Sequence, residues 1–534
     1  MNKFNLIEEP WIPCLMLNGK YEEFNLLDVF AKAHEIKEIN DGSPLVVVSL
    51  HRLLLAILHR NFGPKSFADW KHLWREGSWD VGKLQTYFEK WNNRFNLFDD
   101  ERPFYQYPQV KKKDNQEADI APLEVLMQEK AAGNNATLFD HSFSANPAKY
   151  SPSVAVRSLI SRQVFSFAGG NCYPFNFANA TLVSGFSVLA VGNNLFETLA
   201  LNLVIYHRDK PMPIQVDDEG SLDKPFWERE TLTQAAESDK DGILPFGYLD
   251  YLTWQSRRIK LIPGENFQTV QSCQLQQNYK LKESTNLFDP FKVYVKGDNG
   301  FYPKNLNEDK SLWRDSHTLF QQTNSIEGRS SLFSHLANIA RQIADEEITG
   351  QKNYSFAIFG VINDKANVKL WIQESLPLPL VYLNDNDLLN NLETAIKFAE
   401  DIARNVLKSS LNKLAWELQP NIAGKERSAK ARAIADTFLS MPLYWSSLEI
   451  RFHKLLLKLP SGKDEALREW FGFIDKTAKD AFDKMANTLS GSAIEQKAMV
   501  EGKKAFHCER KKLLKENSTY QEFLPDYKTK GGSA

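Results

Sequence analysis

The last 150 or so residues carry a regular helical pattern of apolar positions. From Leu388 onward, apolar side chains recur every three or four positions, with charged residues between them. This spacing gathers the apolar side chains on one face of a helix, and Asn386 and Asp387 are suitable N-caps. Similar patterns cover about 428–440, 443–458, 464–488 and 493–515, and Pro, Gly and Ser separate them. We therefore predict a C-terminal bundle of about four helices.

The preceding 380 or so residues show shorter apolar runs with frequent Pro, Gly and Asn breaks. The stretch SLPLPLVYLNDND separates the two patterns, so we expect one domain over 1–385 and a second over 386–534. Within the first, SFAIFGVINDKANVKLWIQ contains two strand-like runs around the polar residues Asn363, Asp364, Lys365 and Ala366. This order is typical of a hairpin. Its tip could enter a nucleic-acid groove, or it could be an ordinary turn.

Another break, SFAGGNCYPFNFANA, places Gly169 and Gly170 before Asn171. Paired glycines adopt positive φ and allow a partner close to the backbone. A turn without any ligand fits the same residues.

Length and charge constrain the class of protein. A chain of 534 residues is expected to form at least two domains. Its formal net charge of −2 argues against coating nucleic acid by bulk electrostatics. The charge is uneven, because 388–534 holds 25 Lys and Arg against 19 Asp and Glu, while 1–387 holds 40 against 48. The segment GKERSAKARA, with Arg427, Lys430 and Arg432, is either a solvated helix face or a surface for nucleic acid or a partner.

Cysteine usage and the N-terminus indicate a reducing compartment. Four cysteines lie far apart in the sequence, so we expect buried free thiols and neither a disulfide framework nor a cysteine zinc site. The N-terminus lacks the apolar stretch of a signal peptide, and no apolar run approaches 18 residues. We expect a cytoplasmic protein that does not span a membrane.

No sequence motif identifies an active site. Patterns for phosphate loops, dinucleotide binding, HExxH zinc sites and nucleophile elbows are missing from the sequence. His51 and His59 flank an apolar run and are expected to be packed, while His507 lies in a basic helix. A nuclease with carboxylates that bind Mg²⁺ would need acids converging in space, which no motif supports. We expect no enzymatic activity, no cofactor and no bound metal.

Several segments, in order, resemble a known family. FNLIEEPWIPC, GNNATLFDH, FAGGN, YLTWQSRRIKL, SLWRD, FGVINDKANVKLWIQESLPLPL and WSSLEIRFHKLL are similar to the large subunit of the type I-E CRISPR surveillance complex Cascade, the CasA family. They span nearly the whole chain. The resemblance implies an α+β fold, with a large mixed α/β N-terminal domain followed by a C-terminal four-helix bundle.

It also implies a function in DNA recognition without catalysis. The subunit would bind the short protospacer-adjacent motif (PAM) in double-stranded target DNA and help open the duplex. The complex would then recruit a separate helicase-nuclease. Guide-RNA pairing reads the rest of the target, as in other RNA-guided effectors. A purely structural scaffold subunit of the same ribonucleoprotein is the alternative.

Three elements of the family read the PAM from the minor groove, and the resemblance maps each onto this chain. The glycine loop matches Ala168, Gly169, Gly170 and Asn171. The wedge hairpin matches Asn363, Asp364, Lys365 and Ala366, where Lys365 stands in place of the glutamine usual in the family. The lysine finger matches Lys292 or Lys296 in FKVYVKGDNGFYPK.

The resemblance assigns two further surfaces. GNNATLFDH matches a loop that contacts the guide-RNA 5′ end and a backbone subunit. In it, Phe139 would be an anchor, and Asn134, Asn135 and Thr137 would offer hydrogen bonds. Asp140 and His141 then have no catalytic duty. The basic bundle matches the region that contacts the small subunits and the displaced DNA strand. Within it, Arg427, Lys430 and Arg432 are chosen by their charge, and no family motif supports them.

Overall fold

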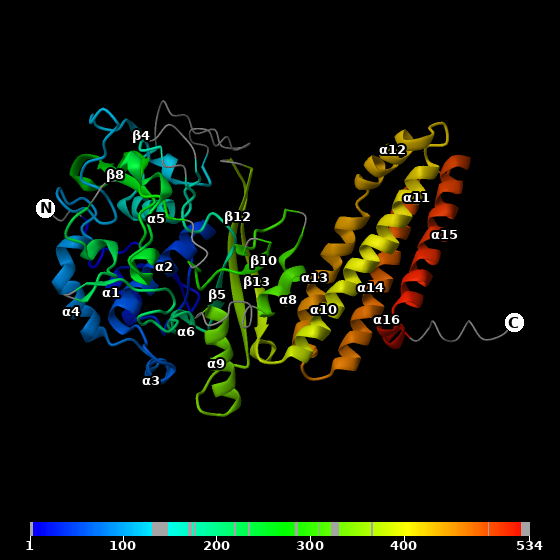
Figure 1. Ribbon diagram of the computed structural model, residues 1–534, viewed down its shortest axis with the longest axis horizontal. Coiled ribbons are helices and arrows are strands. Elements are labelled where there is room, and N and C mark those ends of the chain that lie inside the picture. The colour runs from blue at the N-terminus through cyan, green and yellow to red at the C-terminus, as the bar shows by residue number, and fades with distance from the viewer. Residues whose placement is uncertain are drawn as a thin grey trace. The chain divides into compact units, whose positions relative to one another are not determined.

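The chain divides into two compact units, which the computed structural model describes for most of their residues (Figure 1). Unit 1 comprises 1–310 and 322–380, and unit 2 comprises 311–321 and 381–534. The residues described are 4–130, 148–168, 173–175, 178–217, 220–232, 235–282, 287–298, 300–308, 310–321, 331–364, 367–489 and 491–524.

The predicted fold class is confirmed, since unit 1 mixes helices and strands and unit 2 is helical. The division between the units follows Leu380, five residues before the predicted boundary. The assignment of 311–321 to unit 2 was not predicted.

Unit 1 contains eight α-helices among its described residues. They are α1 (Leu26–Ala31), α2 (Pro44–Phe62), α3 (Phe67–Glu76), α4 (Val81–Trp91), α5 (Pro152–Val164), α6 (Leu195–Leu201), α7 (Tyr248–Leu252) and α9 (Leu332–Ala344), together with the short 3₁₀ turns between them.

The strands of unit 1 form small antiparallel sheets. Three of these sheets lie near the candidate site. Two of them have three strands, in the orders β13-β12-β5 and β4-β9-β8, and the third is the two-stranded hairpin β10-β11. Their bounds are β4 (Ile120–Pro122), β5 (Ser187–Val191), β8 (Arg257–Pro263), β9 (Val270–Gln277), β10 (Tyr294–Gly297), β11 (Gly300–Pro303), β12 (Asn353–Asp364) and β13 (Asn367–Pro379). The others are β2-β1-β3 and β6-β7, with β1 (Ile12–Met16), β2 (Tyr21–Phe24), β3 (Ile36–Ile39), β6 (Val216–Asp217) and β7 (Gly220–Ser221).

Helix α2 forms the centre of the core of unit 1. By length and composition it could cross a membrane, yet 83% of its apolar window is buried inside the protein. Two of its buried polar residues have partners within the fold. Arg52 donates to Asp289 at 2.9 Å, and His51 Nδ1 lies 2.8 Å from the carbonyl oxygen of Val47. His51 and His59 are both buried, which confirms their predicted packing.

The predicted bundle helices are confirmed in unit 2. A continuous helical stretch runs through α10 (Asn386–Asp401), the π-helical segment η9 (Ile402–Lys408) and α11 (Ser409–Glu417). The remaining helices are α12 (Gly424–Asp436), α13 (Ser440–Lys458), α14 (Lys463–Ala486), α15 (Ala493–Glu516) and α16 (Ser518–Phe523). Helix α10 is capped by Asp385, whose side chain accepts from Leu388 N, instead of by the predicted Asn386 or Asp387.

The segment Ser311–Gln321 completes the core of unit 2. It forms the turn η6 (Leu312–Asp315) and helix α8 (Ser316–Phe320). The ring of Trp313 lies 4.6 Å from Phe452 and 6.1 Å from Trp470, centroid to centroid. Next to it, the Arg314 guanidinium lies 3.8 Å from the centre of the Trp445 ring. A short segment from the middle of the sequence is therefore part of the C-terminal bundle.

The cysteines differ from one another in exposure. Cys14 and Cys273 are buried, and burial raises the pKa of each thiol to about 12. The prediction of a buried thiol is wrong for Cys508, which is exposed on α15. Cys172 lies outside the described residues.

Candidate nucleic-acid interface

The predicted hairpin forms an arm of two long strands. Strands β12 and β13 pair antiparallel from Asn353 and Pro379 to Asp364 and Asn367, so two residues join them (Figure 1). Strand β5 pairs only with Ser355–Phe359 of β12. Beyond this point the hairpin continues without β5 from Gly360 to Asp364, or about 17 Å at about 3.3 Å per residue. The hairpin itself is confirmed.

The arm has a firm base and an irregular end. At Gly360 an added Cβ would lie 2.5 Å from the Leu306 side chain, so the sheet is tightly covered there. The register shifts between Ile362 and Asn363, and bulges of this kind re-aim the residues that follow them. The backbone of Asn363 and Asp364 belongs to β12, whereas Lys365 and Ala366 lie outside the described residues.

Strand β5 connects this hairpin to the segment with the two candidate lysines. On one side β5 pairs with β12. On its other side Ser187 bridges to Lys292, and Val188 N donates to the carbonyl of Phe291 at 2.8 Å. The segment 291–292 then continues into the β10–β11 hairpin. Elements more than 60 residues apart in sequence are thus attached to one short strand.

The two candidate lysines have different surroundings. The Lys292 ammonium is buried and donates to the carbonyls of Thr181 at 2.5 Å and Ser184 at 2.7 Å. Burial lowers the pKa of Lys292 to about 8, with the charge of Asp289 acting in the opposite direction. Lys296 lies on β10 opposite Phe301 and is exposed. Of the two lysines, Lys296 has an exposed side chain, whereas that of Lys292 is buried and already bound to two carbonyls.

The segment around the glycine pair is anchored at both ends. Ala180 N donates to the carbonyl of Ser166 at 2.8 Å, and Ala168 N donates to Asn179 Oδ1 at 2.8 Å. Ala168 is half-buried. These two contacts hold the described ends of the segment together. Gly169, Gly170 and Asn171 lie outside the described residues.

Two buried arginines that the sequence did not single out as site residues also hold this loop. Arg257 of β8 donates to the carbonyl of Phe167 at 2.7 Å, and Arg258 donates to that of Tyr173 at 2.5 Å. Gln276 of β9 accepts from Tyr173 N at 2.5 Å. Adjacent arginines in a strand are usually solvated on at least one side, so no signal in the sequence predicts that both are buried. The described residues Phe167 and Tyr173 are therefore held by the β8–β9 sheet.

Lys292 links the loop to the other elements. The carbonyls that it binds, of Thr181 and Ser184, come soon after the anchored residue Ala180, and the same lysine bridges to β5. Gly185, at φ +78°, comes next, and an added Cβ there would lie 2.6 Å from Pro303 at the end of β11. The loop, the β10–β11 hairpin and the β12–β13 arm consequently share one framework around β5.

The three basic residues chosen in the bundle do not form one exposed patch. Arg427 of α12 donates to the carbonyl of Trp416 at 2.8 Å and lies 4.3 Å from the centre of its ring, so it fastens α12 to α11. Lys430 pairs with Glu426 at 3.1 Å on an exposed face. Arg432 is exposed. Of the three, Lys430 and Arg432 are available to a partner at the surface.

The segment GNNATLFDH, with Asn134, Asn135, Thr137 and Phe139, lies outside the described residues. Among the residues that are described, there is no cluster of three His, Cys, Asp or Glu side chains that could hold a metal ion.

Comparisons with known proteins agree along almost the full length. Residues 5–481 match the family described as CRISPR-associated protein Cse1. A curated CRISPR-associated protein CasA/Cse1 from Thermus thermophilus is 29% identical over 520 residues, which are 95% of this chain and 97% of that protein.

Solved structures show the same fold. The crystal structure of Thermus thermophilus CasA matches with a TM-score of 0.79 at 26% identity, covering 96% of this chain and all of that one. A chain from a CRISPR RNA-guided surveillance complex matches with a TM-score of 0.72 at 19% identity, covering 94% of this chain and 99% of that one.

Proposed function

Because this chain belongs to the CRISPR-associated protein Cse1 family, we propose that it is the DNA-recognition subunit of a type I-E guide-RNA surveillance complex in the cytoplasm. The observation that supports this function best is the shared framework around β5. Strand β5 pairs with the β12–β13 arm and bridges to Lys292, which in turn binds the segment that follows the glycine loop. Three short elements that are attached in this way can engage one stretch of duplex together.

The subunit reads the PAM from the minor groove through the glycine loop and Lys296. Without side chains, Gly169 and Gly170 let the backbone lie against the groove floor, while the exposed Lys296 ammonium reaches groove acceptors or phosphates. The minor groove distinguishes A·T from G·C but little else. We therefore expect several related motifs to be accepted.

The β12–β13 arm acts as the wedge that separates the strands next to the PAM. Its two-stranded projection beyond β5 is long enough to place the tip between base pairs. Unstacking a base step costs a few kcal/mol, which DNA contacts and guide pairing offset. Lys365 is a flexible point charge and lacks the flat amide of glutamine, so it serves by contacting phosphate or a base edge.

Other surfaces serve assembly. The loop with Asn134, Asn135, Thr137 and Phe139 contacts the guide-RNA 5′ end and a backbone subunit. The exposed Lys430 and Arg432 contact the small subunits or the displaced strand. Opened DNA then leads to recruitment of a separate helicase-nuclease, and this subunit has no catalytic role.

Assembly and DNA binding must be measured separately to test this function. Complexes are reconstituted with Gly170→Asp, Lys296→Ala or Lys365→Ala, and their subunit composition is checked before titration with target duplex. The proposal requires normal assembly with DNA binding weakened at least tenfold by Gly170→Asp and Lys296→Ala. If all three complexes assemble and bind as the unmodified one does, the subunit is a scaffold.

A further inference from the structure

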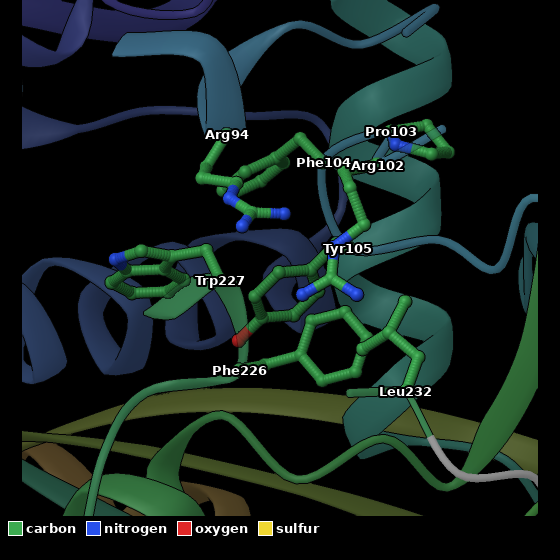
Figure 2. A pocket seen from close by; sticks show the side chains of 8 residues that line it. All are labelled: Arg94, Arg102, Pro103, Phe104, Tyr105, Phe226, Trp227 and Leu232. Atoms are coloured by element: carbon green, nitrogen blue, oxygen red, sulfur yellow. The ribbon is translucent and has the colours of Figure 1, made fainter. Parts of the chain in front are cut away.

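The small hollow of unit 1 in Figure 2 is already occupied by contacts within the chain. Its Arg102 donates to the carbonyl of Arg229, and its Arg94 lies 3.6 Å from Glu230. Aromatic rings enclose the two arginines. A surface of unit 2, in contrast, carries apolar side chains that the described residues leave uncovered.

Helix α13 is apolar on two opposite faces. Its core face is buried in the bundle and includes Tyr444, Leu448, Phe452, Leu455 and Leu456. The opposite face carries a row of apolar side chains whose exposed fractions are between 41% and 71%: Leu443, Ile450 and Leu457. Single apolar residues on a surface are ordinary, but an aligned row indicates a contact surface. We call this row the α13 seam.

The α13 seam has the spacing of a coiled-coil contact. Its members are seven residues apart, so each is turned from the last by only about 20° around the helix axis. A seven-residue apolar repeat keeps the same face toward a second helix over several turns. The seam therefore fits a partner helix that lies along α13.

One flank of the seam is basic. Arg451, Lys454 and Lys458 follow the seam along one side of α13. Together with Trp470 and Phe473 of α14, they line a hollow of about 670 Å³ that is partly open to solvent. The Arg451 guanidinium lies 4.9 Å from the centre of the Phe473 ring. A side chain from a partner on the seam would find this hollow beside it.

Two of the three cations have no acidic partner. Lys458 lies 2.8 Å from Glu469 and 3.3 Å from Glu465, so both acids next to the hollow are used. Arg451 and Lys454 are exposed and, among the described residues, neither forms an ion pair. Carboxylates from outside the chain would match these two charges.

Charge distinguishes among candidate occupants of the seam. Helix α13 contains a single acid, Glu449, so a second copy pairing through the same seam would leave most of the cations unmatched. The C-terminal segment 525–534 holds two lysines and one aspartate, so it does not match either. A helix that lies on a membrane has a broad apolar face, whereas this seam is narrow. A helix with acidic residues fits best.

We infer that the α13 seam docks an amphipathic helix of another protein, with carboxylates on the side that meets Arg451, Lys454 and Lys458. Paired helices match apolar rows to each other and charged flanks to opposite charges. The inference goes beyond the proposed function, which assigns contacts with other subunits to Lys430 and Arg432 of α12. PAM reading and this docking can fail independently.

Fluorescence anisotropy of a labelled peptide, titrated with the full chain at fixed salt, tests the inference. The peptide has three heptads with Leu at positions a and d and Glu at e and g, where like charges oppose pairing with itself. One reference peptide has Lys in place of Glu, and another has the acidic composition in scrambled order. We expect the acidic helix to bind at least ten times more tightly than either reference.

Three variants locate the binding surface. Ile450→Asp puts a charge in the middle of the seam and should weaken binding at least tenfold, with an unchanged melting temperature because Ile450 is 71% exposed. Val500→Asp is the matched control, since Val500 is 63% exposed on α15, and it should bind as the unmodified chain does. Lys454→Glu should weaken binding of the acidic peptide and strengthen that of the lysine peptide.

Four results would overturn the inference. The first two are equal binding of the acidic peptide and its references, and full binding by Ile450→Asp. The third is a dimer of the chain that Ile450→Asp dissociates, because the occupant would then be a second copy. The fourth is binding to vesicles of anionic lipid that Ile450→Asp abolishes, because the seam would then lie on a membrane.

Discussion

The ammonium of Lys292 donates a hydrogen bond of 2.5 Å to the carbonyl oxygen of Thr181. Thr181 follows the glycine loop, and Lys292 itself bridges to Ser187 of β5. A lysine that the family resemblance offers as a DNA contact is therefore used inside the protein. It holds the segment that follows the glycine loop against β5, the strand that pairs with the β12–β13 arm.

This contact predicts different phenotypes for the two candidate lysines. Lys292→Met leaves two buried carbonyls without their donor, so it should lower the free energy of unfolding by about 2–4 kcal/mol, counting 1–2 kcal/mol for each lost bond. Lys296→Ala should leave stability unchanged and weaken DNA binding. Thermal unfolding of each variant and DNA titration of each complex provide the comparison. A stable Lys292→Met chain with specific loss of DNA binding would show that Lys292 itself contacts DNA.

The length of the arm should control duplex opening. Val361 pairs with Trp371, and Ile362 pairs with Leu370. Deleting both pairs shortens the arm by about 7 Å and, because the side-chain period is two, leaves each remaining side chain on its original face. We expect PAM-dependent binding to persist while strand separation slows, as measured by fluorescence of a base analogue next to the PAM. If the duplex opens as fast with the shortened arm as with the unmodified chain, this hairpin is not the wedge.

Trp313 should be essential to the bundle although it lies outside the C-terminal sequence. Its ring packs against Phe452 and Trp470, and it is 2% exposed. Replacing a buried tryptophan by alanine costs about 3–5 kcal/mol, so Trp313→Ala should raise hydrogen exchange throughout α13 and α14. The control is Leu457→Ala, because Leu457 lies on α13, one of the two helices measured, and its side chain is 50% exposed. Equal exchange in both variants would show that the segment 311–321 is dispensable.

Mild acid should destabilise unit 1 through its buried histidines. Burial lowers the pKa of His51 to about 4 and those of His59 and His335 to about 3. These histidines are neutral when folded and take up protons near pH 6.5 when unfolded, so stability falls as the pH drops below 6.5 toward the folded values. At pH 5 the loss is about 2 kcal/mol for each of them.

Denaturant unfolding between pH 7 and pH 5 measures this loss. The variant His335→Phe should have a shallower dependence on pH, because one fewer proton is taken up on unfolding. His507→Gln, at an exposed position of α15, should show the same dependence as the unmodified chain. If the free energy of unfolding of His335→Phe depends on pH as steeply as that of the unmodified chain, His335 does not contribute to the acid sensitivity.

Local pattern predicted much of this fold. The apolar repeat from Leu388 predicted helix α10, and the alternating runs around Asn363 and Asp364 predicted the hairpin. Both elements are encoded by neighbouring residues. Segment 311–321 was not predicted in the bundle, because Trp313 meets Phe452 only after the chain has folded, and short amphipathic segments carry no information about distant partners.

The candidate site was less predictable than the fold, for a similar reason. The residues next to Lys292 in the sequence are those of an ordinary surface lysine. Its burial depends on two carbonyls that lie more than 100 positions earlier in the sequence. Arg257 and Arg258 support the glycine loop through backbone carbonyls, which any residue type provides. Family resemblance supplied the positions of the candidate DNA-binding elements, and their shared attachment to β5 came only from the structure.

The most direct test of PAM reading is selection by the reconstituted guide-RNA complex from target duplexes with a randomised flank, with and without this chain, at fixed salt. We predict that a small set of related flanks is enriched only when the chain is present, and that Gly170→Asp abolishes the enrichment in fully assembled complexes. Equal recovery of all flanks with the unmodified chain in place would contradict PAM reading and leave a scaffold role.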